Sequence, residues 1–350
     1  MSAKSVSLKQ RIKVFAVLGN ALSEGAAGSS EGLASRFATL VYDAEKTNLW
    51  FTPENVTMAL KTLGDRLSYD NISFWLSKYP ELGLETKALS VGVVMAGNIP
   101  MVGFHDLLCV LITGNRIIAR LSSKDELLMK CVAETLVEIE PALKDFIEIR
   151  TGTISGFDMV IATGSDNTSR YFEYYFRNYP SIIRRNRNSI AVLDGTETEI
   201  ELRELGRDVF TYFGLGCRNV SKLYLPTGYD VSVFRDAWSD FEPLRGHHKY
   251  AVNYDHNKAV MIVNRQSFTD LGYILLSNEK SLTPPMAVLN YEFYESKEWL
   301  ENEISATKNA IQCIAGHGHT PFGKSQSPEL WDYADDVDTI LFLSKKNHQR

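Results

Sequence analysis

The sequence of 350 residues has few cysteines, and they lie far apart. No two of them form a CxxC pair, so we expect neither a disulfide-stapled scaffold nor a cysteine-ligated zinc site. The four are Cys109, Cys131, Cys217 and Cys313.

Long hydrophobic runs are also missing. The N-terminal region has only a short apolar run at residues 14–18 and no small-residue cleavage site, so it does not read as a signal peptide. The most apolar stretch, residues 89–114, is interrupted by polar residues and a proline, and we expect no membrane span. The sequence shows no repeat and no low-complexity segment, and a reduced cytoplasmic protein is the default expectation.

Positive charge is not in excess. The chain has 37 Lys and Arg against 43 Asp and Glu, a formal net charge of −6. A general nucleic-acid binder is usually basic, so no nucleic-acid partner is expected. A local basic site that binds an anionic ligand is compatible with this net charge.

The hydrophobic pattern predicts helices first and an α/β arrangement afterwards. Helices are expected at residues 8–23, at 33–46, and from Pro53 towards Leu63 with Thr52 as N-cap. From about residue 89, apolar strands alternate with helices, which indicates a parallel sheet covered on both faces. The predicted strands are residues 88–96, 116–120, 146–149 and 159–162, and the predicted helices are 102–113, 125–139 and 167–177.

The second half continues as α/β. Strands are expected at residues 189–193 and 222–225 with a helix at 199–213 between them, and the strand-like residues 339–343 lie near the end. Four parts are expected along the chain, at residues 1–75, 76–188, 189–315 and 316–350.

Three turns follow predicted strands, at residues 97–100, 121–124 and 163–165. Ligands of such sheets bind at the carboxyl ends of the strands, so this layout predicts a nucleotide site. Thr163-Gly164-Ser165 precedes a helix, as a phosphate-contacting turn does. Arg120, Ser123 and Lys124 stand where cations favour the 2′-phosphate of NADP, although a solvated face is the alternative.

Cys217 is the cysteine whose surroundings favour chemistry. Gly214 and Gly216 precede it, which allows close approach of backbone N–H groups, and Arg218 follows it, which favours a thiolate. A small buried hydrophobe is the alternative. Asn98 is either a turn residue or an amide donor to an oxyanion.

The histidines do not predict a metal site. His317 and His319 lie two residues apart in a glycine loop with no nearby third ligand, which is a poor metal pattern, so no metal is assigned. Cys313 precedes this loop and has no predicted role.

Taken together, four segments resemble the aldehyde dehydrogenase superfamily, and within it the fatty acyl-CoA reductase branch typified by the reductase of bacterial luminescence, in its short bacterial form. The resemblance runs from about residue 50 to the C-terminus. The segments, in chain order, are GNIP at 97–100, IIARLSS at 117–123, ATGS at 162–165 and GLGC at 214–217.

The resemblance implies that the part at 76–188 is a Rossmann-type dinucleotide-binding domain and that the part at 189–315 is an α/β catalytic domain with the nucleophilic cysteine. The helical region at 1–75 would pack on the cofactor domain, and the segment at 316–350 would return to it. The resemblance also implies specific residue roles. Cys217 takes the role of the nucleophile and Asn98 that of the oxyanion hole. Cofactor binding falls to Arg120, to Ser123 in place of the usual glutamate, and to the turn Thr163, Gly164 and Ser165. Because Ser123 replaces an acid, NADPH is expected, with NADH as the alternative. Glu279 is assigned to the nicotinamide ribose.

One departure from the superfamily bears on the reaction. Ordinary aldehyde dehydrogenases carry a glutamate that activates water to hydrolyse the acyl-enzyme, and here that position holds Arg184. Water is then a poor acceptor, which favours exchange with a thiol. Arg184, Arg185 and Arg187 are also candidates for binding the CoA phosphates, although surface arginines are commoner than phosphate sites.

The resemblance therefore implies an oxidoreductase of fatty acid metabolism that reduces an acyl-CoA thioester to the aldehyde with NADPH, through an acyl-enzyme on Cys217. A homo-oligomer is expected. Two alternatives stay open. One is a reductase of the same fold that takes an acyl phosphate or an acyl group from a partner enzyme, and the other is a non-catalytic nucleotide-binding protein.

Overall fold

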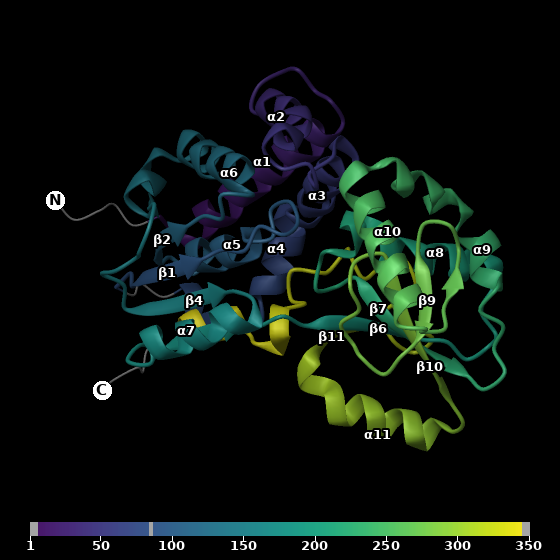
Figure 1. Cartoon of the computed structure of the whole chain (residues 1–350). Coiled ribbons are helices and arrows are strands. Elements are labelled where there is room, and N and C mark those ends of the chain that lie inside the picture. Colours follow the sequence, from purple (N-terminus) through teal and green to yellow (C-terminus); the bar gives the residue numbers. More distant parts are fainter. Residues whose placement is uncertain (1–5, 84–86, 345–350) are drawn as a thin grey trace. The chain divides into compact units, whose positions relative to one another are not determined.

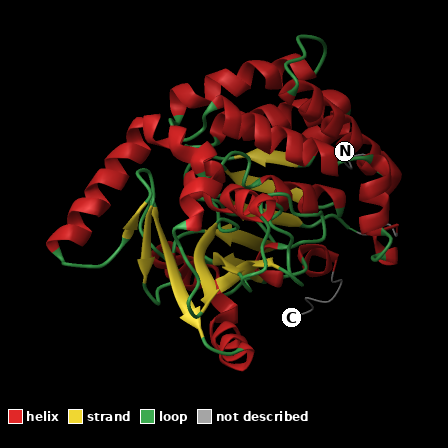
Figure 2. Cartoon of the chain, turned by 90° about the vertical axis from the view of Figure 1, so that its right-hand side faces the viewer, coloured by secondary structure: helices red, strands yellow, loops and turns green. Residues whose placement is uncertain are grey.

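The computed structural model describes residues 6–83 and 87–344, and the chain forms two compact units (Figure 1). The first unit contains the chain up to Arg185 and from Glu329 onward, and the second is Asn186–Pro328. Residues 316–328, which the sequence analysis grouped with the C-terminal return, lie in the second unit. Both units combine helices with strands (Figure 2), and the predicted α/β class is confirmed.

The first unit begins with four helices, and three of them were predicted. Helix α1 (Leu8–Ala26) packs against α2 (Ala34–Thr47) and α3 (Pro53–Arg66). Thr52 caps α3, since its side chain accepts the Asn55 N–H. The fourth helix, α4 (Tyr69–Leu76), and the short η1 (Pro80–Gly83) were not predicted.

A five-stranded parallel sheet forms the centre of the first unit, in the order β3-β2-β1-β4-β5. This order matches the first five strands of the doubly wound dinucleotide-binding sheet, in which the order of the strands reverses between β1 and β4. The strands are β1 (Ser90–Val94), β2 (Arg116–Arg120), β3 (Ile147–Ile149), β4 (Met159–Thr163) and β5 (Ser181–Arg184). The sequence analysis missed only β5, which continues into the basic run.

Alternate residues of these strands face different helices. Val91 and Val93 of β1 join the large core that contains residues of α1, α5 (Phe104–Ile112) and α6 (Glu126–Ile139). Val94 and Val160 join a smaller cluster against Phe172 and Phe176 of α7 (Asp166–Phe176). The sheet is therefore covered on both faces, as a continuous apolar run in each strand predicts. The short helix η2 (Pro141–Asp145) precedes β3.

The C-terminal segment returns to the first unit as a helix. The prediction of a strand at residues 339–343 is wrong, because Thr339–Ser344 forms α12, which packs against α5. Five apolar residues fit either period, and here Ile340 and Leu343 pack as neighbours on one helix face. The short η6 (Ala334–Asp336) precedes it.

The second unit contains a six-stranded sheet in the order β11-β6-β7-β10-β9-β8, parallel except for β8 with β9. Its strands are β6 (Asn188–Val192), β7 (Val220–Pro226), β8 (Thr269–Asp270), β9 (Leu275–Asn278), β10 (Val288–Tyr294) and β11 (Ile311–Gly316). The α-helices are α8 (Glu199–Phe210), α9 (Val233–Ala237), α10 (His248–Val263) and α11 (Lys297–Thr307), and the 3₁₀ helices are η3 (Thr211–Gly214), η4 (Ser239–Gly246) and η5 (Lys308–Ala310).

None of the helices in the described residues combines the length and the apolar character needed to cross a membrane.

Candidate functional site

In the first unit, three of the predicted loops lie at one edge of the sheet. Strand β1 lies between β2 and β4 and runs parallel to both, so the carboxyl ends of these three strands are neighbours. Asn98 follows β1, Arg120 ends β2 with Ser123 three residues later, and Thr163 ends β4 before Ser165. The structure thus gathers the predicted cofactor residues of this unit at the edge where such folds bind ligands.

The chemistry of this edge fits a dinucleotide. Ser165 is the exposed N-cap of the 11-residue α7, and its hydroxyl accepts the Thr168 N–H at 3.4 Å. The N-terminus of a helix favours negative charge. A methyl group added at Gly164 would lie 3.0 Å from side-chain atoms of Thr168 and Phe172, so a side chain here requires these neighbours to shift by a few tenths of an ångström. Arg120 is exposed and supplies a cation at the same edge.

The loop after β1 carries Asn98 and contains a residue in a rarely adopted backbone conformation. Asn98 is exposed, whereas Met101 is buried and has a φ of 58°, in the left-handed region that residues other than glycine rarely adopt. A methyl group at Gly97 would come within 2.4 Å of the Ser122 hydroxyl oxygen, which shows how closely this loop contacts the loop after β2.

In the second unit, Cys217 lies in a turn built around Asn219. Cys217 is the only exposed cysteine of the four, all of which lie in the described part of the chain. The Asn219 amide donates to the carbonyl oxygens of Asp208 at 3.1 Å and Thr211 at 2.8 Å, and its oxygen accepts the Gly216 N–H at 2.8 Å. These bonds hold the segment preceding the cysteine against the end of α8. The Ser189 hydroxyl donates to the Cys217 carbonyl at 2.9 Å and ties the turn to β6.

Sequence reasoning missed Asn219. The available signal was an asparagine two residues after the cysteine and directly before an apolar strand. Its role shows only in the fold, because the carbonyls that it satisfies belong to the end of a helix, where backbone groups have no intrahelical partner.

Glu279 is exposed and begins the loop after β9. Two side chains of β7 hold this loop: the Lys222 ammonium donates to the Lys280 carbonyl at 2.8 Å, and the Ser221 hydroxyl donates to the Leu282 carbonyl at 2.7 Å. The Asn188 amide donates to the Thr283 hydroxyl at 3.1 Å. Since Asn188 and Ser189 are neighbours in β6, the start of that strand anchors both this loop and the Cys217 turn.

Lys222 forms a buried ion pair that the sequence did not predict. Its side chain is 0% exposed, and its ammonium lies 2.6 Å from a carboxylate oxygen of Glu292. Lys222 is on β7 and Glu292 on the neighbouring strand β10. The ion pair with Glu292 therefore holds the Lys222 ammonium in place, and this ammonium binds the loop that carries Glu279.

The structure argues against a phosphate-binding role for Arg184. Its side chain is only 5% exposed, and its guanidinium lies 2.6 Å from the Asp106 carboxylate and donates to the Ala334 carbonyl at 2.7 Å. Burial alone lowers the pKa of Arg184, but the Asp106 carboxylate more than offsets this, so the pKa lies above its ordinary value. Arg184 is therefore a structural ion-pair partner. Arg185 is exposed and pairs with Glu173, and Arg187 donates to the Ile311 carbonyl at 3.1 Å.

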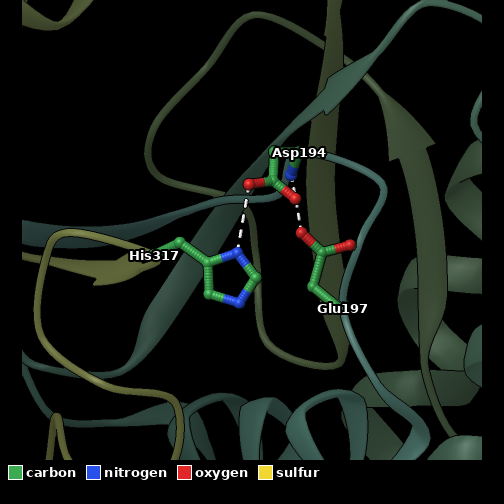
Figure 3. Close-up of side chains that lie close together, drawn as sticks. All are labelled: Asp194, Glu197 and His317. Atoms are coloured by element: carbon green, nitrogen blue, oxygen red, sulfur yellow. Dashed lines mark hydrogen bonds and ion pairs between the residues drawn. The ribbon is translucent and has the colours of Figure 1, made fainter.

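A second cluster of charged groups lies at the carboxyl ends of β6 and β11 (Figure 3). His317 contacts the Asp194 carboxylate through Nδ1 at 3.0 Å and the Glu201 carboxylate through Nε2 at 3.0 Å. These hydrogen bonds raise the pKa of His317 to about 9, so the imidazolium is stabilised. The Thr198 backbone N–H and then the His317 hydrogen bond lower the pKa of Glu201 to about 2. Glu197 accepts the Asp194 backbone N–H at 2.6 Å.

This cluster is separate from the cysteine turn. Asp194, Glu197 and His317 offer potential ligand atoms within 4.8 Å of one another, but both imidazole nitrogens already contact carboxylates. The cluster lies at the carboxyl ends of its strands, whereas Cys217 precedes the amino end of β7.

The remaining cysteines are buried, and Cys313 donates to the Thr320 hydroxyl oxygen at 3.2 Å.

Known proteins of similar structure are aldehyde dehydrogenases. The aldehyde dehydrogenase of Mycobacterium tuberculosis, solved with NAD⁺, matches with a TM-score of 0.60 and 16% identity over 89% of this chain and 73% of its own. Aldehyde dehydrogenase 21 of Physcomitrella patens, solved with succinate, matches with a TM-score of 0.64 and 12% identity over 98% and 84%. At these identities the likeness shows the fold, and the predicted aldehyde-dehydrogenase-like fold is confirmed.

Sequence comparison identifies the family. No curated protein matches the chain. The family model described as acyl-CoA reductase (LuxC) matches residues 42–283, which is more than half of the chain and includes Asn98, Ser165 and Cys217. The chain belongs to the acyl-CoA reductase (LuxC) family.

Proposed function

We propose that this protein reduces an acyl-CoA thioester to the aldehyde with NADPH, through an acyl-enzyme on Cys217. The observation that carries the proposal is the exposed Cys217, held by Asn219 and Ser189 in a defined turn, in a chain of the acyl-CoA reductase family. An exposed cysteine in a built turn is available as a nucleophile, whereas the buried Cys109 has a pKa raised by desolvation.

Acyl transfer is the first step. The Cys217 thiolate attacks the thioester carbonyl, the new carbon–sulfur bond forms, and the bond to the CoA sulfur breaks, so that CoA leaves as its thiol with the proton that Cys217 gave up. The resemblance to the aldehyde dehydrogenase superfamily assigns the oxyanion donors of this step to the Asn98 side-chain amide and the Cys217 backbone N–H. One such donor is typically worth about 10²–10³ in rate.

Reduction is the second step. When bound, NADPH supplies a hydride to the acyl carbon. The same two donors, from Asn98 and Cys217, stabilise the second oxyanion. Its collapse breaks the carbon–sulfur bond, releases the aldehyde and restores the Cys217 thiolate. Overall, acyl-CoA, NADPH and a proton give aldehyde, CoA and NADP⁺.

The residues at the cofactor edge support NADPH as the cofactor. Ser165 and the N-terminus of α7 are suited to the pyrophosphate. Arg120 and Ser123 follow β2, where an acidic residue would favour NAD and a cation favours the 2′-phosphate. Glu279 would accept a hydrogen bond from the nicotinamide ribose.

Arg184 supports reduction over hydrolysis. By the resemblance it stands in the position of the glutamate that activates water in ordinary aldehyde dehydrogenases, and in the structure it is buried beside Asp106. A buried guanidinium cannot act as a base near neutral pH. The acyl-enzyme is therefore expected to persist until a thiol or a hydride reaches it.

The test follows NADPH absorbance with a panel of acyl-CoAs for wild type, Cys217→Ala and, as a matched control, Cys313→Ala. Oxidation that requires both acyl-CoA and Cys217 supports the proposal. Turnover with an acyl phosphate but with no acyl-CoA would show that the acyl donor is an acyl phosphate. Full activity of Cys217→Ala, or no cofactor binding by wild type, would contradict it.

A further inference from the structure

A buried carboxyl group lies behind the loop that carries Asn98. Asp125 is the N-cap residue of α6 and is 3% exposed, yet its side chain makes no capping hydrogen bond. Neither of its carboxylate oxygens has a hydrogen-bond partner among the described residues. Burial raises the pKa of Asp125 well above its usual range, which favours the neutral acid. Leaving such a group unpaired costs about 1–3 kcal/mol.

Asp125 contacts the Asn98 loop on both sides of the asparagine. On one side, a methyl group added at Gly97 would lie 3.2 Å from the Asp125 Cβ. On the other side, the carboxyl group faces the backbone amide of Met101. Met101 is the residue of this loop with a positive φ, a conformation that costs on the order of 1–3 kcal/mol unless its surroundings hold it.

We propose that Asp125 is a positioning residue that acts through Asn98: its buried carboxyl group, which lies against Gly97 and faces the Met101 N–H, holds the loop in the conformation that aims the Asn98 amide at the oxyanion. Because Asp125 is buried, the proposal gives it no contact with substrate or cofactor. This inference rests on the proposed function, because it gives Asp125 a part in the step that Asn98 performs.

Two variants separate positioning from a merely structural role. Asp125→Leu removes an unpaired buried polar group, so its melting temperature should not fall, whereas its kcat should fall about 10–100-fold because the donor is misplaced. The KM for acyl-CoA and the Kd for NADPH should change less than about threefold. Asp125→Asn keeps a carbonyl acceptor in the same place and should retain kcat within about threefold.

The control is Thr135→Val on the same helix. Thr135 is 0% exposed, and its hydroxyl oxygen also lacks a hydrogen-bond partner among the described residues. Its removal should leave kcat and stability at the wild-type values or slightly raise stability. A kcat loss in Thr135→Val equal to that in Asp125→Leu would show a general effect of α6 and overturn the proposal.

A double-mutant cycle gives the decisive result. If Asp125 acts through Asn98, adding Asp125→Leu to Asn98→Ala should lower kcat less than about threefold further. If the two losses multiply, or if Asp125→Leu keeps wild-type kcat, the proposal is overturned. Failure of the proposed function is distinguishable, because wild type would then show no acyl-CoA-dependent NADPH oxidation, and the positioning role would fall with it.

Discussion

Replacing Arg184 should cost stability and leave substrate binding unchanged. The guanidinium and the Asp106 carboxylate are 5% and 11% exposed, and removing one partner of such a pair costs about 3–5 kcal/mol because the other charge stays buried. For a unit of this size, that corresponds to a fall in melting temperature of roughly 6–20 °C. Arg184→Met and Asp106→Leu should each show it.

The double variant separates the stability contribution of the ion pair from that of the other hydrogen bonds that Arg184 makes. With both charges removed, the Ala334 carbonyl and the Thr339 hydroxyl still lose their donor, at about 0.5–1.5 kcal/mol each. We therefore expect Arg184→Met/Asp106→Leu to lose about 1–3 kcal/mol, which is less than either single variant loses.

The assay is thermal unfolding followed by circular dichroism, with the KM for acyl-CoA measured well below the transition. Arg185→Met is the matched control, because Arg185 is exposed and should change stability by less than about 1 kcal/mol. A tenfold rise in the KM for acyl-CoA with unchanged stability in Arg184→Met would refute the reasoning and would support a role for Arg184 in binding the CoA phosphates.

Three further predictions concern the second unit. Lys222→Met should lose about 3–5 kcal/mol in denaturant unfolding, and Lys222→Met/Glu292→Leu should lose less; a double-variant loss equal to the sum of the Lys222→Met and Glu292→Leu losses would show that the pair is not coupled. Asn219→Ala should lower kcat at least about tenfold, since the Cys217 turn loses its support, and the rate of Cys217 alkylation should change with it; an unchanged rate would contradict this role. His317 has a pKa raised to about 9, so its contribution to stability is fully present below about pH 6.5 and is lost as pH rises through about 9. His317→Asn should remove this dependence from the unfolding midpoint, and an unchanged pH profile would refute it.

The sequence predicted the first sheet well because its signals are local. Each central strand is a continuous apolar run, and the turns after them carry glycine, asparagine or serine. Residues 116–120 were predicted as a strand and form β2 with the same bounds. The parallel arrangement then places the loops of Asn98, Arg120 and Ser165 at one edge, which needs no further information.

Two of the misses share a physical cause, which is that the deciding partner is distant along the chain. Arg184 belongs to a basic run in the sequence, and only the fold brings it to Asp106, 78 residues away. Lys222 reads as a surface residue in a short strand, but its partner Glu292 is 70 residues away on the neighbouring strand. Residues 339–343 were predicted as a strand because five residues cannot separate two periods.

The central claim is the covalent intermediate on Cys217. Incubating the protein with an acyl-CoA in the absence of NADPH, followed by mass spectrometry of the intact chain and its peptides, tests it most directly. We predict a mass gain of one acyl group on the Cys217 peptide, release of an equal amount of CoA thiol, and loss of the adduct when NADPH is added. An unmodified Cys217 during NADPH-dependent turnover, or an acyl group retained by Cys217→Ala, would contradict the account.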